Sequence, residues 1–343
     1  MNEASSDRLD VGVIGAGSWG TALAFLLADR GHQVTLWAHE PEVSAAINER
    51  HENTVFLSDI RLPDNLGATS DLEEACRGRD MIVTVTPSHV TRRVLTEAAP
   101  YLPRHVPIVS ATKGIENETL LTVSEILEEV LPVEFHPYLA YLSGPSFARE
   151  VAQRHPTAVV VAAWSEKLAV AVQRAFNHRT FRVYRSNDVM GVEIGGALKN
   201  VIAIAAGAAD GMGFGHNSRA GLISRGLAEI SRMAVARGAN PLTLAGLAGM
   251  GDLVLTCTGG LSRNRQVGMQ LGKGRSLDEI LGEMNMVAEG VKTARSVHDL
   301  AIREGVEMPI CSAVYEVLYE DKSVQQALVD LMGRELKRES FGF

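Results

Sequence analysis

Gly15-Ala-Gly-Ser-Trp-Gly20 lies directly after the apolar run Val11 to Ile14 and directly before the helix-like stretch Thr21 to Asp29. A strand that turns into a helix through Gly15 and Gly17 brings bare backbone and a helix N-terminus up to a pyrophosphate. Gly20 lets the helix lie close on the sheet. In this context the motif predicts a dinucleotide-binding site. The glycines alone would also fit a turn that binds nothing, or a site for another adenine-containing ligand.

The second predicted strand, Gln33 to Trp37, lacks the acidic residue that usually closes it and hydrogen-bonds the adenosine ribose. It runs instead into Ala38, His39 and Glu40. Glu40 comes late for that contact, and Ala38 has no side chain that could bind or repel a 2′-phosphate. The choice between NAD and NADP therefore stays open.

Length and composition fit an enzyme of two domains: 343 residues, of which 46% are hydrophobic. The net charge of −8 does not suggest a nucleic-acid-binding surface, so any phosphate recognition must be local. Cys76, Cys257 and Cys311 lie far apart without paired spacing, which favours reduced thiols over a disulfide framework or zinc ligands. No metal site is expected.

Two observations favour a soluble cytoplasmic protein without stable membrane association. Residues Met1 to Asp10 are polar and carry no apolar stretch of the kind found in signal peptides. The most apolar later segment, Ile194 to Ala209, contains Lys199 and Asn200 and is shorter than the roughly 20 residues that span a bilayer.

The two parts of the chain differ in their hydrophobic pattern. Up to about Asp188, short β-branched runs alternate with helical patterns such as Leu120 to Val130. The runs are Met81 to Thr86, Pro107 to Thr112, Tyr138 to Ser143, Thr157 to Ala163 and Phe181 to Tyr184. We therefore predict an α/β fold, with an N-terminal Rossmann-type, mainly parallel sheet over residues 1–188 and an all-α C-terminal domain over residues 189–343.

Helical periodicity dominates the second part. The stretch Arg219 to Arg237 is an example, in which Asn217 or Ser218 would cap the start and Gly238 would end the helix. Its apolar residues at helical spacing are Leu222, Ile223, Leu227, Ile230 and Ala234.

Ligands of open α/β sheets bind beyond the carboxyl ends of the strands, so residues just past each strand are candidates for chemistry. These positions hold Pro87-Ser88, Lys113-Gly114 and Gly144-Pro-Ser-Phe-Ala148. The last segment would turn tightly and present backbone N–H groups and the Ser146 hydroxyl to an oxyanion or a hydroxyl, or it could be only a turn.

Lys199 lies in the stretch Gly191 to Ala209, which is unusually rich in glycine and alanine for a helix. Such a composition lowers helix propensity, which suggests that the surface approaches another backbone or a ligand. Lys199 would emerge from small residues and be easily desolvated. Desolvation lowers the pKa of a lysine, which would suit Lys199 to exchange a proton with a substrate oxygen near neutral pH.

Two later segments carry charged and polar candidates. Asp252 follows the glycine-rich stretch that begins at Gly246, and it is either a turn residue or a carboxylate brought beside Lys199. In the segment Ser262-Arg-Asn-Arg265, Arg263 and Asn264 offer a cation and an amide to a phosphate, although each alone would fit a solvated loop.

These residues, in this order, resemble the bacterial NAD(P)-dependent glycerol-3-phosphate dehydrogenase family from about Val11 to Met308. The matching stretches are GAGSWGTALA at 15–24, SATKGIE at 110–116, LSGPSFA at 142–148, GGALKNVIAIAAG at 195–207, NSRAGLISRGLAE at 217–229, GLAGMGDLVLTCT at 246–258, SRNR at 262–265 and VAEGVKTA at 287–294. One departure is Ala38, where many relatives carry Arg, and it weakens any claim of NADP preference.

The resemblance implies interconversion of sn-glycerol 3-phosphate and dihydroxyacetone phosphate, with hydride transfer to or from NAD or NADP, for glycerophospholipid synthesis. It implies that Lys199 is the general acid/base, with Lys113 and Asp252 beside the substrate. The implied substrate contacts are Gly144, Ser146, Ser262, Arg263 and Asn264. The implied cofactor contacts, besides the glycines of the turn, are Ser18, Trp19, His39, Lys113, Ala148, Arg263, Val287 and Glu289.

Two other hypotheses stay open on the residues alone. A dehydrogenase of β-hydroxyacids would share the sheet and use a helix lysine, but such enzymes tend to carry Asn one turn after it. Here Asn200 is adjacent to Lys199 and position 203 is Ala. A non-catalytic NAD(P)H sensor would need no converging lysine, aspartate and arginine. The glycine- and alanine-rich helices would suit a homodimer interface.

Overall fold

The computed structural model describes residues 8–284, 288–336 and 338–339. The chain forms two compact units. The first contains the chain up to Thr112 together with Ser124–Leu142 and Ser146–Asn187. The second contains Lys113–Val123, Ser143–Pro145 and the chain from Asp188 onward. Two short segments that follow strands of the sheet thus belong to the helical unit.

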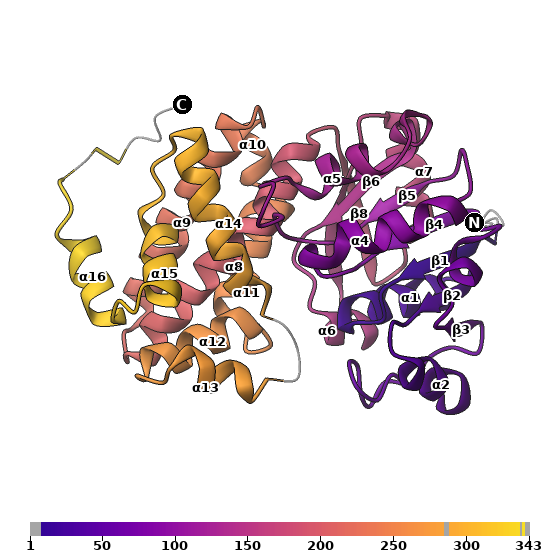
Figure 1. The fold of residues 1–343 in the computed structure, drawn as a ribbon, viewed down its shortest axis with the longest axis horizontal. Coiled ribbons are helices and arrows are strands. Elements are labelled where there is room, and N and C mark those ends of the chain that lie inside the picture. The colour runs from indigo at the N-terminus through magenta and orange to yellow at the C-terminus, as the bar shows by residue number, and fades with distance from the viewer. Residues whose placement is uncertain (1–7, 285–287, 337, 340–343) are drawn as a thin grey trace. The chain divides into compact units, whose positions relative to one another are not determined.

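The first unit is built on an eight-stranded sheet with the order β3-β2-β1-β4-β5-β6-β7-β8 (Figure 1). Six neighbouring pairs, β1–β2, β1–β4, β2–β3, β4–β5, β5–β6 and β7–β8, are parallel. The strands are β1 (Asp10–Ile14), β2 (Gln33–Trp37), β3 (Leu66–Thr69), β4 (Met81–Thr84), β5 (Ile108–Ser110), β6 (Leu139–Ser143), β7 (Thr157–Ala162) and β8 (Phe181–Ser186). The order 3-2-1-4-5-6 is that of a dinucleotide-binding fold, whose ligand crevice lies where the strand order reverses, at β1 and β4.

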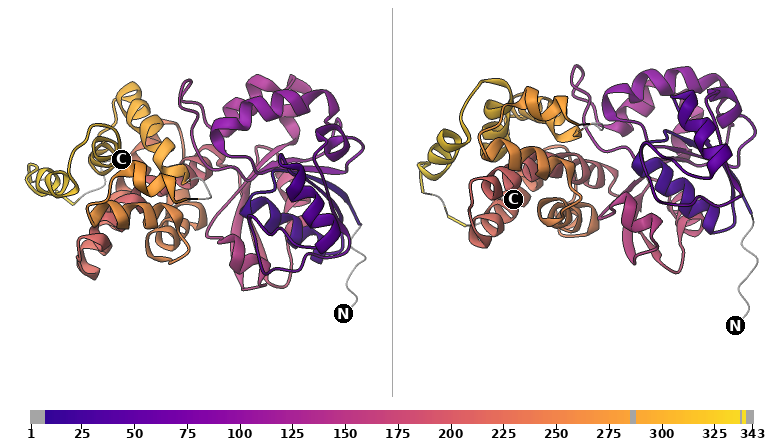
Figure 2. Two further views of the ribbon diagram at one scale, coloured as in Figure 1. Left: turned by 60° about the horizontal axis from the view of Figure 1, so that its bottom comes forward. Right: turned by 90° about the horizontal axis from the view of Figure 1, so that it is seen from below.

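Helices lie on both faces of this sheet (Figures 1 and 2). They are α1 (Ser18–Asp29), α2 (Pro41–Arg50), α3 (Leu72–Cys76), α4 (Ser88–Ala98), α5 (Val123–Val130), α6 (Ala148–Ala152) and α7 (Glu166–Phe176). Short 3-10 helices occupy Ala99–Tyr101 and Val133–Tyr138. Apolar side chains of the strands and of α1 form one buried core.

From Asp188 onward, the described residues form helices and connecting loops. The helices are α8 (Val189–Gly211), α9 (His216–Ala236), α10 (Pro241–Leu244), α11 (Asp252–Thr258), α12 (Arg263–Gly272), α13 (Leu277–Gly282), α14 (Glu289–Glu304), α15 (Pro309–Tyr319) and α16 (Val324–Met332), with a π-helical turn at Leu247–Gly251. The predicted fold class, a mainly parallel Rossmann-type sheet followed by an all-α region, is confirmed.

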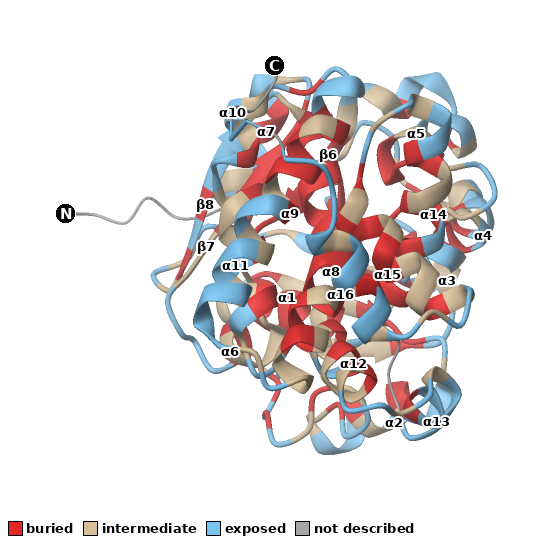
Figure 3. Ribbon diagram, turned by 90° about the vertical axis from the view of Figure 1, so that its left-hand side faces the viewer, coloured by how far each residue is buried: buried red, intermediate tan, exposed pale blue. Residues whose placement is uncertain are grey.

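Helix α8 is the central element of the helical unit, and most of its residues are buried (Figure 3). Its small residues permit direct backbone packing. A Cβ atom on Gly207 would lie 2.0 Å from the carbonyl oxygen of Arg265 in α12, and one on Gly268 of α12 would lie 2.0 Å from that of Ile204. The expectation that this surface approaches another backbone is confirmed.

The length of α8 corrects one prediction. The helix has 23 residues rather than the 16 counted from Ile194 to Ala209, so by length and composition it is long enough to cross a membrane. A second stretch, Pro241–Thr258, meets the same criterion. In α8, however, 83% of the apolar window is buried inside the protein, and the window of Pro241–Thr258 is 39% buried. The high burial of the α8 window, rather than the length of the helix, indicates that α8 is a core helix.

Several element boundaries differ from the predictions. Helix α1 begins at Ser18, three residues before Thr21. Helix α5 begins at Val123 and not at Leu120, because Leu120 has a left-handed backbone (φ 59°) that a helix does not accommodate. Strand β3, with the sequence LGAT, was not predicted, because it carries little β-branched signal and is defined by its pairing with β2.

In α9, the predicted N-cap was wrong and the predicted end was right. The N-cap is Gly215, and Asn217 and Ser218 lie inside the first turn. Gly238 follows the C-cap in a left-handed conformation (φ 84°), as a helix-terminating glycine does. On the predicted apolar face, Ile230 and Ala234 are buried, whereas Leu222, Ile223 and Leu227 are half-buried.

The strands also end differently from the predictions. Strands β4 and β5 are shorter, ending at Thr84 and Ser110, and β8 is longer, reaching Ser186. The three cysteines are free and buried, as expected for reduced core thiols.

Candidate active site

In the first unit, the turn after β1 has the local geometry that a glycine-rich dinucleotide loop requires. Gly15 has φ 116°, and a Cβ atom there would lie 2.6 Å from the carbonyl oxygen of Val85. A Cβ atom on Gly20 would lie 1.8 Å from the Gly15 carbonyl oxygen, so α1 can pack on the turn only through a glycine. At Gly17, which is exposed, a Cβ atom would meet no protein atom within 4 Å. Nothing in the protein itself requires glycine there, whereas a ligand that approaches the backbone would.

The other cofactor candidates of this unit lie at element termini. Ser18 and Trp19 begin α1, and the buried indole Nε1 of Trp19 has no hydrogen-bond partner among the described residues. His39 is exposed just past β2, with its ring centroid 5.9 Å from that of Trp37. Ala148 is the first residue of α6.

Three further residues of this unit concern the choice of cofactor or the contact with substrate. Ala38 is fully buried, and Glu40 is the N-cap residue of α2. Ser146 belongs to the same unit as the glycine turn. Residue 38 therefore supplies no cation at the end of β2.

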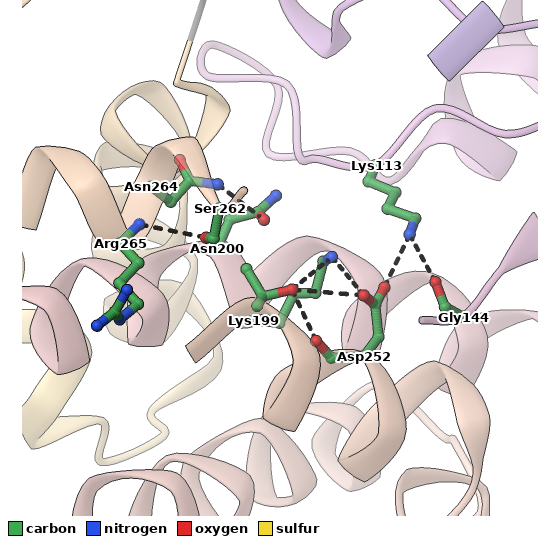
Figure 4. Close-up of polar contacts among 9 residues, drawn as sticks. Lys113, Gly144, Lys199, Asn200, Asp252, Ser262, Asn264 and Arg265 are labelled. Carbon is green, nitrogen blue, oxygen red and sulfur yellow. Dashed lines mark hydrogen bonds and ion pairs between the residues drawn. The ribbon is translucent and has the colours of Figure 1, made fainter. Parts of the chain in front are cut away.

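In the helical unit, Lys199 lies at the centre of a buried polar cluster (Figure 4). Its Nζ donates to Oδ1 of Asp252 at 2.6 Å and to Oγ1 of Thr256 at 2.9 Å. The second carboxylate oxygen, Oδ2 of Asp252, accepts from Nζ of Lys113 at 2.7 Å. The Lys113 Nζ also donates to the carbonyl oxygen of Gly144 at 3.1 Å. Four of the residues predicted from sequence are thus in direct contact.

Burial determines the charge behaviour of this cluster. The side chains of Lys199 and Asp252 are 9% and 1% exposed. Burial lowers the pKa of Lys199 from 10.5 to about 8, with the Lys113 cation acting in the same direction and the Asp252 carboxylate opposing it. Lys199 therefore has both ammonium and amine forms accessible near neutral pH, as its small-residue helix predicted.

Thr256 was not predicted from sequence. It lies one turn after Asp252 on α11, and its hydroxyl donates to the Asp252 carbonyl oxygen at 2.7 Å while accepting from Lys199. This helical back-bond fixes the hydroxyl so that its lone pairs face the lysine. The only sequence signal was the spacing of four residues from Asp252.

The segment at the start of α12 contains two arginines. Arg265 forms an ion pair within the protein, whereas Arg263 has no such partner among the described residues. Arg265 binds Asp210, with Nε 2.8 Å from Oδ2, and Asp210 also binds Arg219 of α9. Arg263, half-buried in the first turn of α12, makes no hydrogen bond or ion pair with the described residues. Its guanidinium is therefore available to an anion at a helix N-terminus.

Ser262 and Asn264 have defined partners. The Ser262 hydroxyl caps α12 by accepting from the backbone N–H of Arg265 at 3.3 Å. The Asn264 amide donates to Oδ1 of Asn200 at 3.0 Å and accepts from the backbone N–H of Gly290 at 2.9 Å. Asn264 thereby joins α12 to α8, next to Lys199, and to the start of α14. Asn200 was not among the predicted site residues.

Two predicted cofactor contacts remain. Glu289 is the first residue of α14, and its charge raises the pKa of Lys199, which opposes the effect of burial. Val287 lies outside the described residues.

Comparison with known proteins gives a consistent result along the chain. Residues 10–169 match the family model described as NAD-dependent glycerol-3-phosphate dehydrogenase N-terminus, and residues 188–329 match the corresponding C-terminus model. The sequence is 60% identical over 330 residues to glycerol-3-phosphate dehydrogenase [NAD(P)+] of Myxococcus xanthus, covering 96% of this chain and 98% of that protein. It is 61% identical over 329 residues to the enzyme of the same description from Citrifermentans bemidjiense, with the same coverage.

Solved structures agree with the sequence matches. The crystal structure of glycerol-3-phosphate dehydrogenase from Coxiella burnetii superimposes with a TM-score of 0.90 at 38% identity, covering 95% of this chain and 99% of that one. A 3-hydroxyisobutyrate dehydrogenase from Salmonella typhimurium shares only the fold, with a TM-score of 0.54 and 17% identity. This chain belongs to the NAD-dependent glycerol-3-phosphate dehydrogenase family.

Proposed function

We propose that this protein interconverts sn-glycerol 3-phosphate and dihydroxyacetone phosphate, using NAD(P) as the hydride acceptor or donor. The observation that carries the proposal is the buried cluster of Lys199, Asp252, Thr256 and Lys113, found in a member of this enzyme family. A secondary alcohol needs a base for its proton and a polarising group for its oxygen, and this cluster supplies both.

Lys199 acts as the general acid/base. During oxidation, the neutral amine accepts the proton of the C2 hydroxyl while the C2 hydrogen leaves as hydride and the C2 carbonyl forms. During reduction, the ammonium returns the proton to the C2 oxygen. A lysine with a pKa of about 8 serves both directions near neutral pH. Asp252 and Thr256 orient the nitrogen, and Asp252 limits how far burial lowers its pKa.

Lys113 polarises the C2 oxygen from the other side of Asp252. Its ammonium is held between the Asp252 carboxylate and the Gly144 carbonyl, so its position does not depend on the substrate. Arg263 binds the substrate phosphate, and Ser262 and Asn264 shape the helix terminus around it. Gly144 and Ser146 are assigned as further substrate contacts.

The glycine turn of the first unit fits a dinucleotide, because Gly17 leaves its backbone open and the Trp19 indole offers an unused donor. When bound, the nicotinamide ring accepts or donates the hydride. We assign the pyrophosphate to residues 15–20 and further cofactor contacts to His39, Ala148, Arg263, Val287 and Glu289. In this assignment, residues 1–188 form the dinucleotide-binding domain, except for Lys113–Val123 and Ser143–Pro145, which belong with residues 189–343 to the substrate domain.

A spectrophotometric assay tests the function. The purified protein is expected to oxidise NADH or NADPH, followed at 340 nm, when dihydroxyacetone phosphate is added. Two substrates serve as controls: unphosphorylated dihydroxyacetone in the same direction, and a β-hydroxyacid in the reverse direction. Because the site recognises a phosphate, weak turnover of both is expected. Nucleotide binding without turnover of dihydroxyacetone phosphate would favour an NAD(P)H sensor instead.

Three further assignments depend on this activity. We propose that the physiological product is glycerol 3-phosphate for glycerophospholipid synthesis, that the enzyme works in the cytoplasm, and that it forms a homodimer. Comparing kcat/KM for NADH and NADPH gives the cofactor preference, and sedimentation of the full chain gives its oligomeric state.

A further inference from the structure

The Ser143 hydroxyl is a buried polar group that the proposed mechanism does not use. Ser143 is the last residue of β6, next to Gly144, and is 6% exposed. Its Oγ has no hydrogen-bond partner among the described residues. Leaving a hydroxyl buried and unpaired is unfavourable, so such a group in an enzyme points to a partner supplied by a ligand.

Gly196 of α8 shows where this hydroxyl lies along the helix that carries Lys199. A Cβ atom on Gly196 would lie 2.7 Å from the Ser143 Oγ and 3.6 Å from Cγ of Lys113. The hydroxyl and the Lys113 stem therefore lie against the same residue of α8, about one turn before Lys199. A side chain at position 196 would displace the hydroxyl from this place, so glycine there leaves it room.

The polar groups of this cluster contact α8 at successive positions along the helix. Ser143 and Lys113 lie at Gly196, the acid/base follows at Lys199, and the Asn264 amide contacts Asn200. Figure 4 shows Lys113 and Gly144 on one side of Lys199, with Asn264 and Ser262 on the other. The substrate has the same order, with a terminal hydroxyl on C1, the reacting oxygen on C2 and the phosphate on C3.

We propose that the Ser143 hydroxyl binds the C1 hydroxyl of the substrate and is a specificity-determining residue. This inference rests on the proposed function, which places the C2 oxygen at Lys199 and the phosphate at Arg263. A site that hydrogen-bonds a substrate hydroxyl discriminates against the analogue that lacks it, because the buried protein group then stays unpaired.

The test compares dihydroxyacetone phosphate with hydroxyacetone phosphate, which has a methyl group in place of the C1 hydroxymethyl. Ser143→Ala is expected to lower kcat/KM for dihydroxyacetone phosphate roughly tenfold, the worth of one hydrogen bond, and to leave kcat/KM for hydroxyacetone phosphate unchanged. The preference of the enzyme for the hydroxylated substrate then falls by the same factor. Ser143→Cys, which keeps the size but is a weak donor, is expected to behave alike.

Ser231→Ala is the matched control, because Ser231 on α9 is also 6% exposed and lies outside the cluster; its substrate preference is expected to equal that of the unmodified protein. The proposal would be overturned if both Ser143 variants kept the preference of the unmodified protein for dihydroxyacetone phosphate over hydroxyacetone phosphate. This holds whether kcat/KM for the two substrates falls equally or does not fall. Absence of dihydroxyacetone phosphate reduction by the unmodified protein would overturn the proposed function and this inference with it.

Discussion

Lys199 and Glu229 are both buried ionisable residues of the helical unit with a pKa shifted toward neutrality. Burial lowers the pKa of Lys199 to about 8 and raises that of Glu229 to about 7. Lys199 is held by the side chains of Asp252 and Thr256. Glu229, on α9, accepts two backbone N–H groups at the start of α15, from Ile310 at 2.7 Å and Cys311 at 3.1 Å.

The difference lies in the partners. The backbone donors at a helix N-terminus need an acceptor, and Glu229 satisfies them within the protein, so its role is to hold α9 and α15 together. The cluster of Lys199 is instead built from side chains, and the proposed mechanism uses the Lys199 nitrogen to exchange a proton with the substrate. Both residues therefore have a shifted pKa. Only the chemistry of their partners distinguishes Lys199, a general acid/base, from Glu229, which caps a helix.

The largest effect should appear in catalysis. Lys199→Ala is expected to lower kcat about 10²- to 10⁴-fold, because it removes general acid/base transfer at the C2 oxygen, with little change in nucleotide affinity. Glu229→Gln is expected to keep kcat near that of the unmodified protein. Steady-state assays and nucleotide titration measure both, with Lys292→Ala, an exposed lysine of α14, as the control. Near-normal turnover by Lys199→Ala would remove it from the mechanism.

Protein stability should respond to pH in opposite directions at the two residues. The pKa of Glu229 rises from 4.5 to about 7 on folding, so the folded protein holds this proton more tightly and stability falls as the pH increases from 4.5 to 7. The pKa of Lys199 falls from 10.5 to about 8, so the unfolded chain holds this proton more tightly and stability rises between pH 8 and 10.5. Each shift corresponds to ~3 kcal/mol.

Urea unfolding across these pH ranges measures this prediction. Glu229→Gln should remove the change between pH 4.5 and 7, and Lys199→Met should remove the change between pH 8 and 10.5. If each variant keeps the pH dependence of the unmodified protein in its own range, the contrast drawn between the two residues is wrong.

The smallest expected effects distinguish Arg263 from Arg265 of α12, as a substrate-binding residue is distinguished from a structural one. Arg263→Ala is expected to raise KM for the phosphorylated substrate roughly tenfold, the loss of about one charge-assisted hydrogen bond. Arg265→Ala is expected to lower the free energy of unfolding by about 1–3 kcal/mol, because Asp210 loses one of its two partners, with KM little changed. Kinetics and urea unfolding on both variants check this, and the reverse assignment of effects would contradict it.

Much of the fold and part of the site could be predicted from the sequence. The glycine turn is local, so its six residues carry the geometry that the structure shows at Gly15 and Gly20. Alternating runs predicted the sheet, but β3 and the ends of β4, β5 and β8 depend on pairing with neighbouring strands, which no local pattern contains. The N-cap of α9 was wrong because several capping residues lie near that helix start.

By itself, the sequence determined which chemical groups are present and the elements that carry them: a glycine turn between a strand and a helix, a lysine on a small-residue helix, and a cation at the start of α12. Only the tertiary structure decided which groups meet. Lys113, Ser143, Lys199 and Asp252 come from four separate segments, and their contacts exist because α8 packs closely against the segments that carry them. The resulting burial, which is a property of the packed helices and not of any single residue, lowers the pKa of Lys199, and the same packing sets Ser143 against Gly196 of α8.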